Sequence, residues 1–169
     1  TVSSSDLTSA YPTSWIREWL NQEFLPTLYN YENIIVEDAG WYSITDSAST
    51  PTKPTGDYTL TDPVGLLNAY EYYMSYKNTS YSNGYLNIGY YWWLITPYDS
   101  SNVLRVYDDG SLNNFYPAHI TGYGVRPSLN LKSTIQFVDG LGTANVPYRI
   151  NGDIEAPESN VTLINTRAS

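Results

Sequence analysis

Few side chains in this sequence have the chemistry that catalysis requires. His119 is the single histidine, and cysteine is absent from all 169 residues. These counts exclude a metal site with several histidines, a thiolate zinc site and a cysteine nucleophile. The neighbouring carboxylates Glu37–Asp38 and Asp108–Asp109 would point to opposite faces of a strand.

Sequence motifs for other reaction classes are missing as well. The chain has neither a Gly-x-Ser-x-Gly nucleophile elbow nor a glycine-rich phosphate loop. The sequence therefore predicts a non-catalytic protein with no cofactor and no metal site, and His119 is interpreted as a surface histidine or one with its hydrogen bonds satisfied. A glycan-active hydrolase with dispersed carboxylates is the enzymatic alternative, because such a pair can come from distant positions.

One covalent possibility involves a lysine. Lys132 follows the apolar stretch 129–131, and a lysine beside an asparagine and a carboxylate can form an intramolecular isopeptide bond in envelope proteins. The alternative is a solvated lysine at the end of a strand. An intact-mass measurement separates the two, because the bond lowers the mass of the chain.

The composition favours binding over catalysis. The chain has 18 tyrosines but only 3 phenylalanines, and its net charge is −9. Tyrosine offers a rigid aromatic surface with a polar tip, which suits half-exposed binding surfaces, although strands also use tyrosine on their faces. The negative charge repels phosphate backbones and anionic lipids, so we expect no nucleic-acid partner and no membrane-surface binding.

The elements that would position these side chains follow an α+β order. Residues 14–25 predict a helix that is capped by Thr13 or Ser14 and ended by Pro26, and residues 62–74 predict a second helix. A strand is predicted around residues 33–36, followed by an exposed loop over residues 46–57. Later strands are predicted at 90–96, 103–107, 125–131 and 145–150, and Asp108–Ser111 is predicted to be a hairpin turn.

Several large side chains are predicted to be structural. Trp15 and Trp19 fall on the apolar stripe of the first helix, and Trp92 and Trp93 are neighbours in a strand. We therefore expect Trp15 and Trp19 in the core, and at least one of the two strand tryptophans as scaffold. Arg126 precedes a proline in an extended stretch and is expected to bind a buried carboxylate.

Motifs spread over most of the chain resemble a known domain. Residues 16–21 read IREWLN, 92–97 read WWLITP, 106–112 read VYDDGSL, 124–131 read GVRPSLNL and 137–150 read FVDGLGTANVPYRI. This order resembles an uncharacterised domain of Gram-positive envelope proteins with the pattern WWLRSP, a strand ending at DG, and GVRPAL.

The resemblance carries implications for the fold. The motif order is similar to that of C-type lectin-like folds, which implies two helices flanking a small, twisted, mostly antiparallel sheet with long loops. Ile95 and Thr96 replace the usual arginine and serine of the motif, and the Glu-Pro-Asn and Trp-Asn-Asp triplets of calcium-dependent lectins are missing. The resemblance therefore implies no calcium-mediated sugar binding.

Together these observations predict a domain organisation. Residues 1–13 are expected to be a lead-in segment, 14–152 the C-type lectin-like domain, and 153–169 a tail or the start of a following module. The chain starts at Thr1 without a signal peptide or an apolar span, so we interpret it as a mature or excised fragment without direct membrane insertion.

The predicted function is that of a secreted adhesin-type surface domain in the envelope of a Gram-positive bacterium, binding a glycan or protein ligand. The stretches 70–91 and 98–107 are the first candidates for its binding surface, and within them we expect ligand contacts from Tyr90, Tyr91, Tyr98, Arg105 and Tyr107. The alternative is a structural, pilin-like subunit that lacks its apolar N-terminal helix, with homo-oligomer or appendage assembly as a possible partnership.

Overall fold

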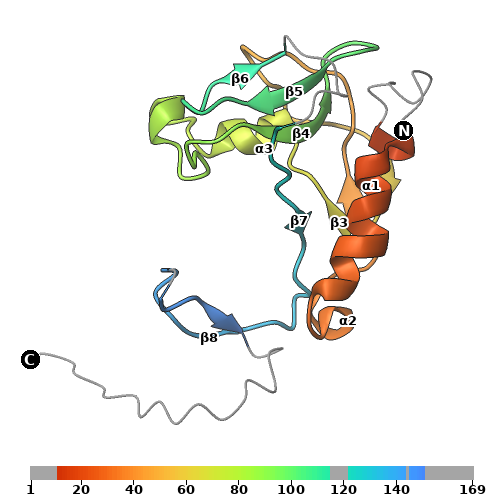
Figure 1. Ribbon diagram of the computed structural model, residues 1–169, viewed down its shortest axis with the longest axis vertical. Coiled ribbons are helices and arrows are strands. Elements are labelled where there is room, and N and C mark those ends of the chain that lie inside the picture. The colour runs from red at the N-terminus through yellow and green to blue at the C-terminus, as the bar shows by residue number, and fades with distance from the viewer. Residues whose placement is uncertain (1–10, 115–121, 144, 151–169) are drawn as a thin grey trace, which may run out of the picture.

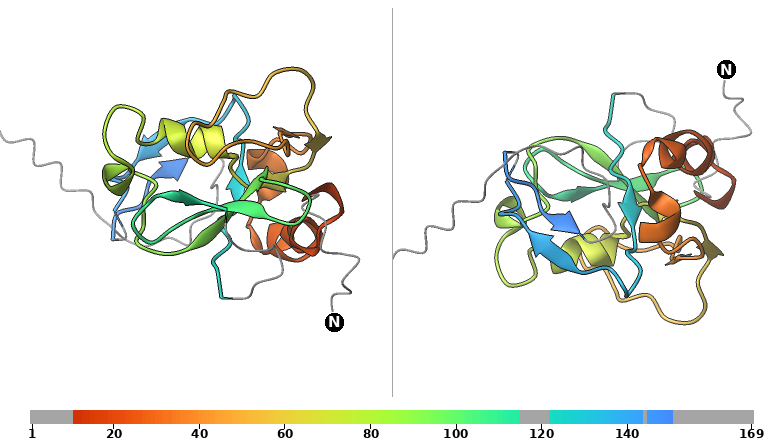
Figure 2. Two further views of the ribbon diagram at one scale, coloured as in Figure 1. Left: turned by 90° about the horizontal axis from the view of Figure 1, so that it is seen from above. Right: turned by 90° about the horizontal axis from the view of Figure 1, so that it is seen from below.

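The computed structural model describes residues 11–114, 122–143 and 145–150 (Figures 1 and 2). These residues form a mixed α+β fold of short helices and small antiparallel sheets, as the sequence predicts. The helical elements are η2 Tyr11–Thr13, α1 Trp15–Trp19, η3 Leu20–Phe24, η4 Leu25–Thr27, α2 Tyr31–Ile34, α3 Ala69–Met74 and η5 Tyr81–Asn83. The strands are β1 Gly40–Trp41, β2 Leu60–Thr61, β3 Val64–Gly65, β4 Trp92–Pro97, β5 Val103–Val106, β6 Leu112–Asn113, β7 Ser128–Leu129, β8 Phe137–Asp139 and β9 Arg149–Ile150.

The first predicted helix exists as a continuous helical run from α1 through the π-helical η3 to the 3-10 turn η4. Ser14 caps it, because its hydroxyl accepts a 3.3 Å hydrogen bond from the backbone N–H of Arg17. Trp19 is half-buried and packs against the core, whereas Trp15 is 62% exposed. The prediction of a core Trp15 is therefore wrong: Leu20 and Leu25 are the buried residues of this helical run, and the Trp15 ring stacks on that of Trp19 with a centroid distance of 6.5 Å.

The strand predicted around residues 33–36 is wrong. Tyr31–Ile34 forms the short helix α2, which begins after Asn30 turns the chain with a φ of 56°. Only Ile35 makes an isolated antiparallel bridge, to Leu131. The apolar run is buried through a helix end and a single bridge instead of a strand.

The second predicted helix begins seven residues later than the sequence suggests. Val64–Gly65 forms strand β3, which pairs with β7, and helix α3 starts at Ala69. Asn68 accepts a 2.9 Å bond from the Glu71 N–H, and the Glu71 carboxylate accepts a 2.8 Å bond from the Asn68 N–H. This reciprocal capping box fixes the start of α3.

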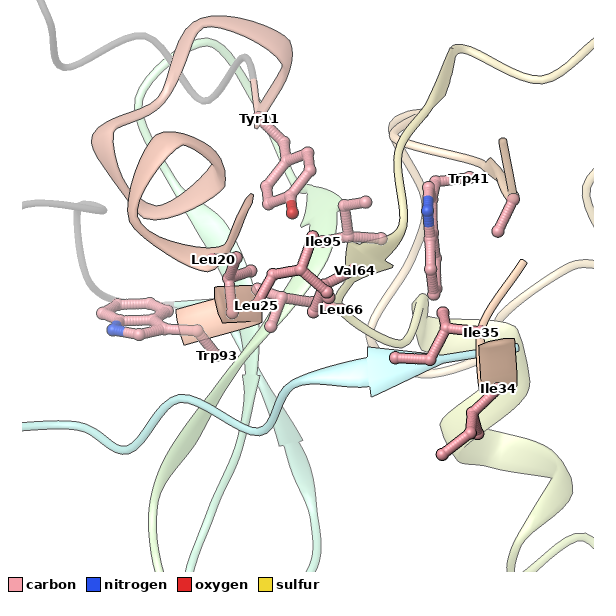
Figure 3. Packing of buried hydrophobic residues seen from close by; sticks show 11 residues of the cluster. Tyr11, Leu20, Leu25, Ile34, Ile35, Trp41, Val64, Leu66, Trp93 and Ile95 are labelled. Carbon is pink, nitrogen blue, oxygen red and sulfur yellow. The ribbon is translucent and has the colours of Figure 1, made fainter. Parts of the chain in front are cut away.

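The three-stranded sheet β4–β5–β6 carries a separate apolar cluster on each face. Trp93 and Ile95 belong to the cluster that includes Leu20 and Leu25 of the helical run, as Figure 3 shows. The other face contributes the second cluster, whose buried members are Ala69, Tyr72, Trp92, Leu94, Leu104 and Val106. Helical segments therefore cover both faces of the sheet, and both strand tryptophans are buried scaffold.

The later strands are found near the predicted positions but are shorter. Strand β7 covers two residues of the predicted strand 125–131, and β9 covers two residues of 145–150. The predicted Asp-Gly turn joins β5 to β6, with Gly110 at a φ of 89° that suits glycine. Strand β8 pairs antiparallel with β9 to form a hairpin, and β8 lies below the main body in Figure 1.

Candidate functional site

The most exposed aromatic group in the middle of the chain lies on the loop between α3 and β4. This loop, residues 75–91, is called the tyrosine loop below. Tyr81 is 45% exposed, Tyr85 78% and Tyr90 72%. A ladder of ring contacts leads from the helix into the loop, joining Tyr73 to Tyr76 with a centroid distance of 5.4 Å and Tyr76 to Tyr81 at 6.4 Å. The loop thus presents aromatic surface to solvent from a packed base.

Arg126 fastens the tyrosine loop to the sheet. Its Nη1 donates a 2.6 Å hydrogen bond to the Leu86 carbonyl, and its guanidinium lies 4.6 Å from the centroid of the Trp92 ring. Desolvation by burial lowers the pKa of Arg126 from its ordinary value. The sequence predicts a carboxylate as the partner of Arg126, whereas the observed partners are a carbonyl and an aromatic ring.

The turn between β5 and β6 packs against the same loop. A side chain at Gly110 would come within 2.4 Å of the Tyr81 carbonyl and 2.9 Å of Asn87 Nδ2, so only glycine fits there. Beneath the turn, the buried hydroxyl of Tyr72 donates a 2.6 Å bond to the Gly110 carbonyl. Burial raises the pKa of Tyr72, which keeps this donor protonated. The turn is therefore a second anchor for the loop.

Arg105 does not reach the surface. Its side chain is 1% exposed, and its guanidinium lies 4.4 Å from the ring centroid of Tyr123 and 4.9 Å from that of Tyr107. The prediction that Arg105 contacts a ligand is wrong in this arrangement, because aromatic rings cover it. Arg105 instead supports those rings through cation–π contacts.

Tyr91 and Tyr107 form the upper part of this aromatic stack. Their ring centroids are 4.8 Å apart, and Tyr91 also contacts Tyr123 at 5.6 Å. Both predicted residues are half-buried, so their rings offer edges to solvent. Desolvation raises the pKa of Tyr91, and the nearby Asp108 carboxylate raises it further, so the phenol stays a hydrogen-bond donor at neutral pH.

Tyr98 is not part of this site. It follows Pro97, which pairs with Val103 at the far end of the β4–β5 hairpin. There the Asp99 carboxylate accepts hydrogen bonds from Asn102 and from the Ser101 N–H, and these bonds lower the pKa of Asp99. The structure therefore brings Tyr90, Tyr91 and Tyr107 to one end of the hairpin and leaves Tyr98, 39% exposed, at the other.

Sequence reasoning missed two residues of the site. Tyr123 contacts Tyr91, Trp93 and Arg105, yet it lies in a stretch without apolar periodicity. Asn87 orders the tyrosine loop by donating to the Ser82 carbonyl at 3.2 Å and accepting from the Gly89 N–H at 3.1 Å. The Asn-x-Gly spacing of residues 87–89 is a turn signal that could have pointed to Asn87.

A shallow hollow of about 310 Å³ lies beside α1, and it is polar. Arg17 and Asp62 at its wall form an ion pair with a 2.6 Å contact, and their charges offset each other. In the part of the chain that the structure describes, no group of three or more histidine, cysteine, aspartate or glutamate side chains could hold a metal ion. His119 lies outside the described residues.

Lys132, the residue considered for an isopeptide bond, contacts the backbone. Its Nζ donates to the carbonyl oxygen of Glu32. This contact places the amine beside a main-chain carbonyl. An intact-mass measurement remains the test for an isopeptide bond at Lys132. Within the described ranges, no helix has both the length and the apolar character that crossing a membrane requires.

Comparison with known proteins identifies the family. Residues 3–133 match the model of a domain of unknown function, DUF6273. The chain belongs to the DUF6273 family. The matched residues include the tyrosine loop, the β5–β6 turn and Arg126, whereas β8 and β9 follow the DUF6273 match. Neither the curated proteins nor the solved structures provide a match.

Proposed function

We propose that this DUF6273 chain is a non-catalytic recognition domain on the envelope of a Gram-positive bacterium, where it binds a glycan or protein ligand at the tyrosine loop. The observation that carries the proposal is the exposure of Tyr85 and Tyr90, at 78% and 72%, on a loop with fixed anchors. Exposed tyrosines with a supported base are characteristic of binding surfaces, because a rigid ring loses little conformational entropy when a ligand covers it.

The anchors matter as much as the rings. Arg126 holds the Leu86 carbonyl, and Gly110 packs against Tyr81 and Asn87, so both halves of the tyrosine loop are tied to the sheet. A loop that is ordered before binding avoids the entropy cost of ordering it on contact. The arrangement supports recognition because the fold maintains solvent-exposed rings in a fixed position.

The non-catalytic part of the proposal rests on the sequence, which lacks cysteine and contains one histidine. We also propose the C-type lectin-like fold as the finer description of the α+β architecture. Helical segments on both faces of a small antiparallel sheet, joined by long loops, support this description. An experimental structure with a different strand connection around β4 and β5 would contradict it.

Binding assays on a glycan array and on intact Gram-positive cells test the proposed function. We expect the double variant Tyr85→Ser, Tyr90→Ser to weaken binding by about tenfold or more, because aromatic contacts dominate such surfaces. Tyr29→Ser is the matched control, since Tyr29 is 64% exposed but lies outside the loop. Undiminished binding by the double variant, or no binding by the unmodified chain, would overturn the proposal.

A second candidate function is that of a structural subunit of a surface appendage. One observation favours it, namely the apolar side chains that the β8–β9 hairpin leaves exposed, such as Phe137 at 60% and Leu141 at 73%. An enzymatic role would instead require turnover of a polysaccharide that disappears when a single aspartate or glutamate is replaced. Assembly of the chain into filaments, without any ligand binding, would favour the structural role.

A further inference from the structure

The hairpin formed by β8 and β9, residues 137–150, is well organised internally. Phe137 and Tyr148 pack with ring centroids 5.2 Å apart. Arg149 donates to the Asp139 carboxylate through Nε at 2.6 Å and also through Nη2. A side chain at Gly142 would come within 2.6 Å of the Tyr148 ring, so the turn fits its own aromatic residue closely.

The same hairpin exposes an unusual amount of apolar surface. The fractional exposures are 60% for Phe137, 57% for Val138, 73% for Leu141, 45% for Val146 and 64% for Tyr148. Isolated exposed apolar residues are ordinary, but a contiguous group on one element marks a surface that something covers. Two strands without further support are also marginally stable in water, and in the described part of the chain β8 pairs with β9 alone.

The base and the tip of the hairpin differ. Ile135 and Ile150 at the base pack against the main core cluster, and the Lys132 N–H donates a 2.9 Å bond to the Ile34 carbonyl just before it. Leu141 and Val146 lie in the turn at the tip. In Figure 1, β8 lies apart from the tyrosine loop along the long axis of the molecule. The body therefore anchors the hairpin without covering it.

Charge indicates which partner this surface fits. The chain carries a net charge of −9, so two copies repel each other over most of their surface. Residues 134–150 contain two charged side chains, Asp139 and Arg149, and these form an ion pair with each other. The hairpin is thus a neutral, apolar element of an acidic molecule, so a contact between two hairpins does not itself bring like charges together.

We propose that the β8–β9 hairpin is a self-association element that packs against the same hairpin of a second copy. A two-fold arrangement satisfies both copies at once, because the same apolar side chains lie on each side of the contact. The contact covers Leu141 and Tyr148 of both chains, and each two-stranded hairpin is stabilised by packing against the other. This inference does not depend on the ligand of the tyrosine loop.

Sedimentation velocity of the 169-residue chain tests the proposal over about 1 to 100 µM, the range of weak to moderate affinities. We expect a dimer that Leu141→Asp weakens by about tenfold or more, since a buried charge without a partner is costly. Leu141 is 73% exposed, so its replacement removes little packing within one chain. Val138→Thr keeps the β-branched shape and is expected to weaken the dimer to a smaller extent.

Ile88→Asp serves as the matched control, because Ile88 is also an exposed aliphatic residue, at 49%, but lies in the tyrosine loop. Its dimer is expected to equal that of the unmodified chain. Salt screens the repulsion between the acidic bodies, so the dimer is expected to persist or strengthen in concentrated sodium chloride. A chain that stays monomeric, a dimer unaffected by Leu141→Asp, or one abolished by salt would overturn the proposal.

Discussion

Replacing Arg126 by alanine is expected to destabilise the protein and to loosen the tyrosine loop. The change removes the 2.6 Å hydrogen bond to the Leu86 carbonyl and the guanidinium that lies 4.6 Å from the Trp92 ring. A hydrogen bond with a charged partner contributes about 1.5 to 3 kcal/mol. A partly exposed cation–π contact adds about 0.5 to 1 kcal/mol.

The total expected loss is about 2 to 3 kcal/mol, because water can reach the half-buried site and replace part of the lost bond. With an m-value of about 2 kcal/mol/M, the urea midpoint falls by about 1 to 1.5 M. Arg126→Lys keeps the charge but lacks the planar group that stacks on a ring. Its urea midpoint is therefore expected to lie between those of the unmodified chain and Arg126→Ala. Lys77→Ala, an exposed cation in the same loop, is the control and stays within about 0.5 kcal/mol of the unmodified chain.

Limited proteolysis separates the effect on the loop from the effect on the whole fold. Chymotrypsin cleaves after tyrosine. Tyr81 begins the 3-10 turn η5, and Tyr85 lies in the next turn, which the Asn87 N–H closes by donating a 2.9 Å bond to the Gly84 carbonyl. In Arg126→Ala we expect cleavage there to accelerate under conditions in which global unfolding is negligible. An unchanged urea midpoint together with unchanged loop cleavage would refute the role assigned to Arg126.

Three further predictions concern the fold that supports the site. Tyr72→Phe leaves the Gly110 carbonyl without its buried donor and is expected to cost about 1 to 2 kcal/mol in urea unfolding; equal stability would contradict the hydrogen bond. Asn68→Ala removes the capping box with Glu71 and is expected to cost about 1 kcal/mol, which lowers the melting temperature by about 2 to 4 °C. Burial raises the pKa of Tyr11 and Tyr72, so the folded state keeps protons that the unfolded chain loses above about pH 10. Stability is therefore fully present below that pH and falls as pH rises beyond it, and a urea midpoint that stays flat into strong alkali would contradict this prediction.

Local signals in the sequence predicted the elements that depend on local contacts. The Ser14 cap acts within one helical turn, and the bulky run predicted as a strand over residues 90–96 forms β4, Trp92–Pro97. The prediction of where α3 starts was wrong because of a contact between distant residues. The predicted helix over residues 62–74 begins at Asp62, but the Asp62 carboxylate accepts hydrogen bonds from Arg17, 45 positions earlier in the chain. No pattern around residue 62 shows that partner.

The prediction that Arg105 reaches a ligand failed for a different reason. Arg105 alternates with Leu104 and Val106, and alternation normally places the polar residue on the solvent side of a sheet. In this protein apolar clusters cover both faces of the β4–β5–β6 sheet, so the polar position is buried as well. The tyrosine-rich composition predicted a region that does expose aromatic rings, whereas the separation of Tyr98 from Tyr91 follows only from the pairing of the strands.

The contacts of Trp92 explain why distant motifs form one site. The Trp92 ring meets Tyr72 of α3 edge-on at a centroid distance of 5.4 Å, and the guanidinium of Arg126 lies 4.6 Å from its centroid. Arg126 then holds the Leu86 carbonyl of the tyrosine loop. A change at Trp92 would thus reach the helix, the loop and the segment before β7 together. The tryptophan pair and the Gly-Val-Arg-Pro segment are best understood as one support for the exposed rings.

The two proposed surfaces make a joint prediction about binding to a cell. A dimer formed through the β8–β9 hairpins leaves both tyrosine loops free, since β8 lies apart from the tyrosine loop along the long axis of the molecule in Figure 1. Two linked sites bind a surface of repeated ligands about 100-fold or more tightly than one site. Leu141→Asp is therefore expected to reduce retention on cells while leaving the affinity for a soluble, monovalent ligand unchanged. Equal loss in both assays would instead place Leu141 in the ligand site, and equal retention would show that the two surfaces act independently.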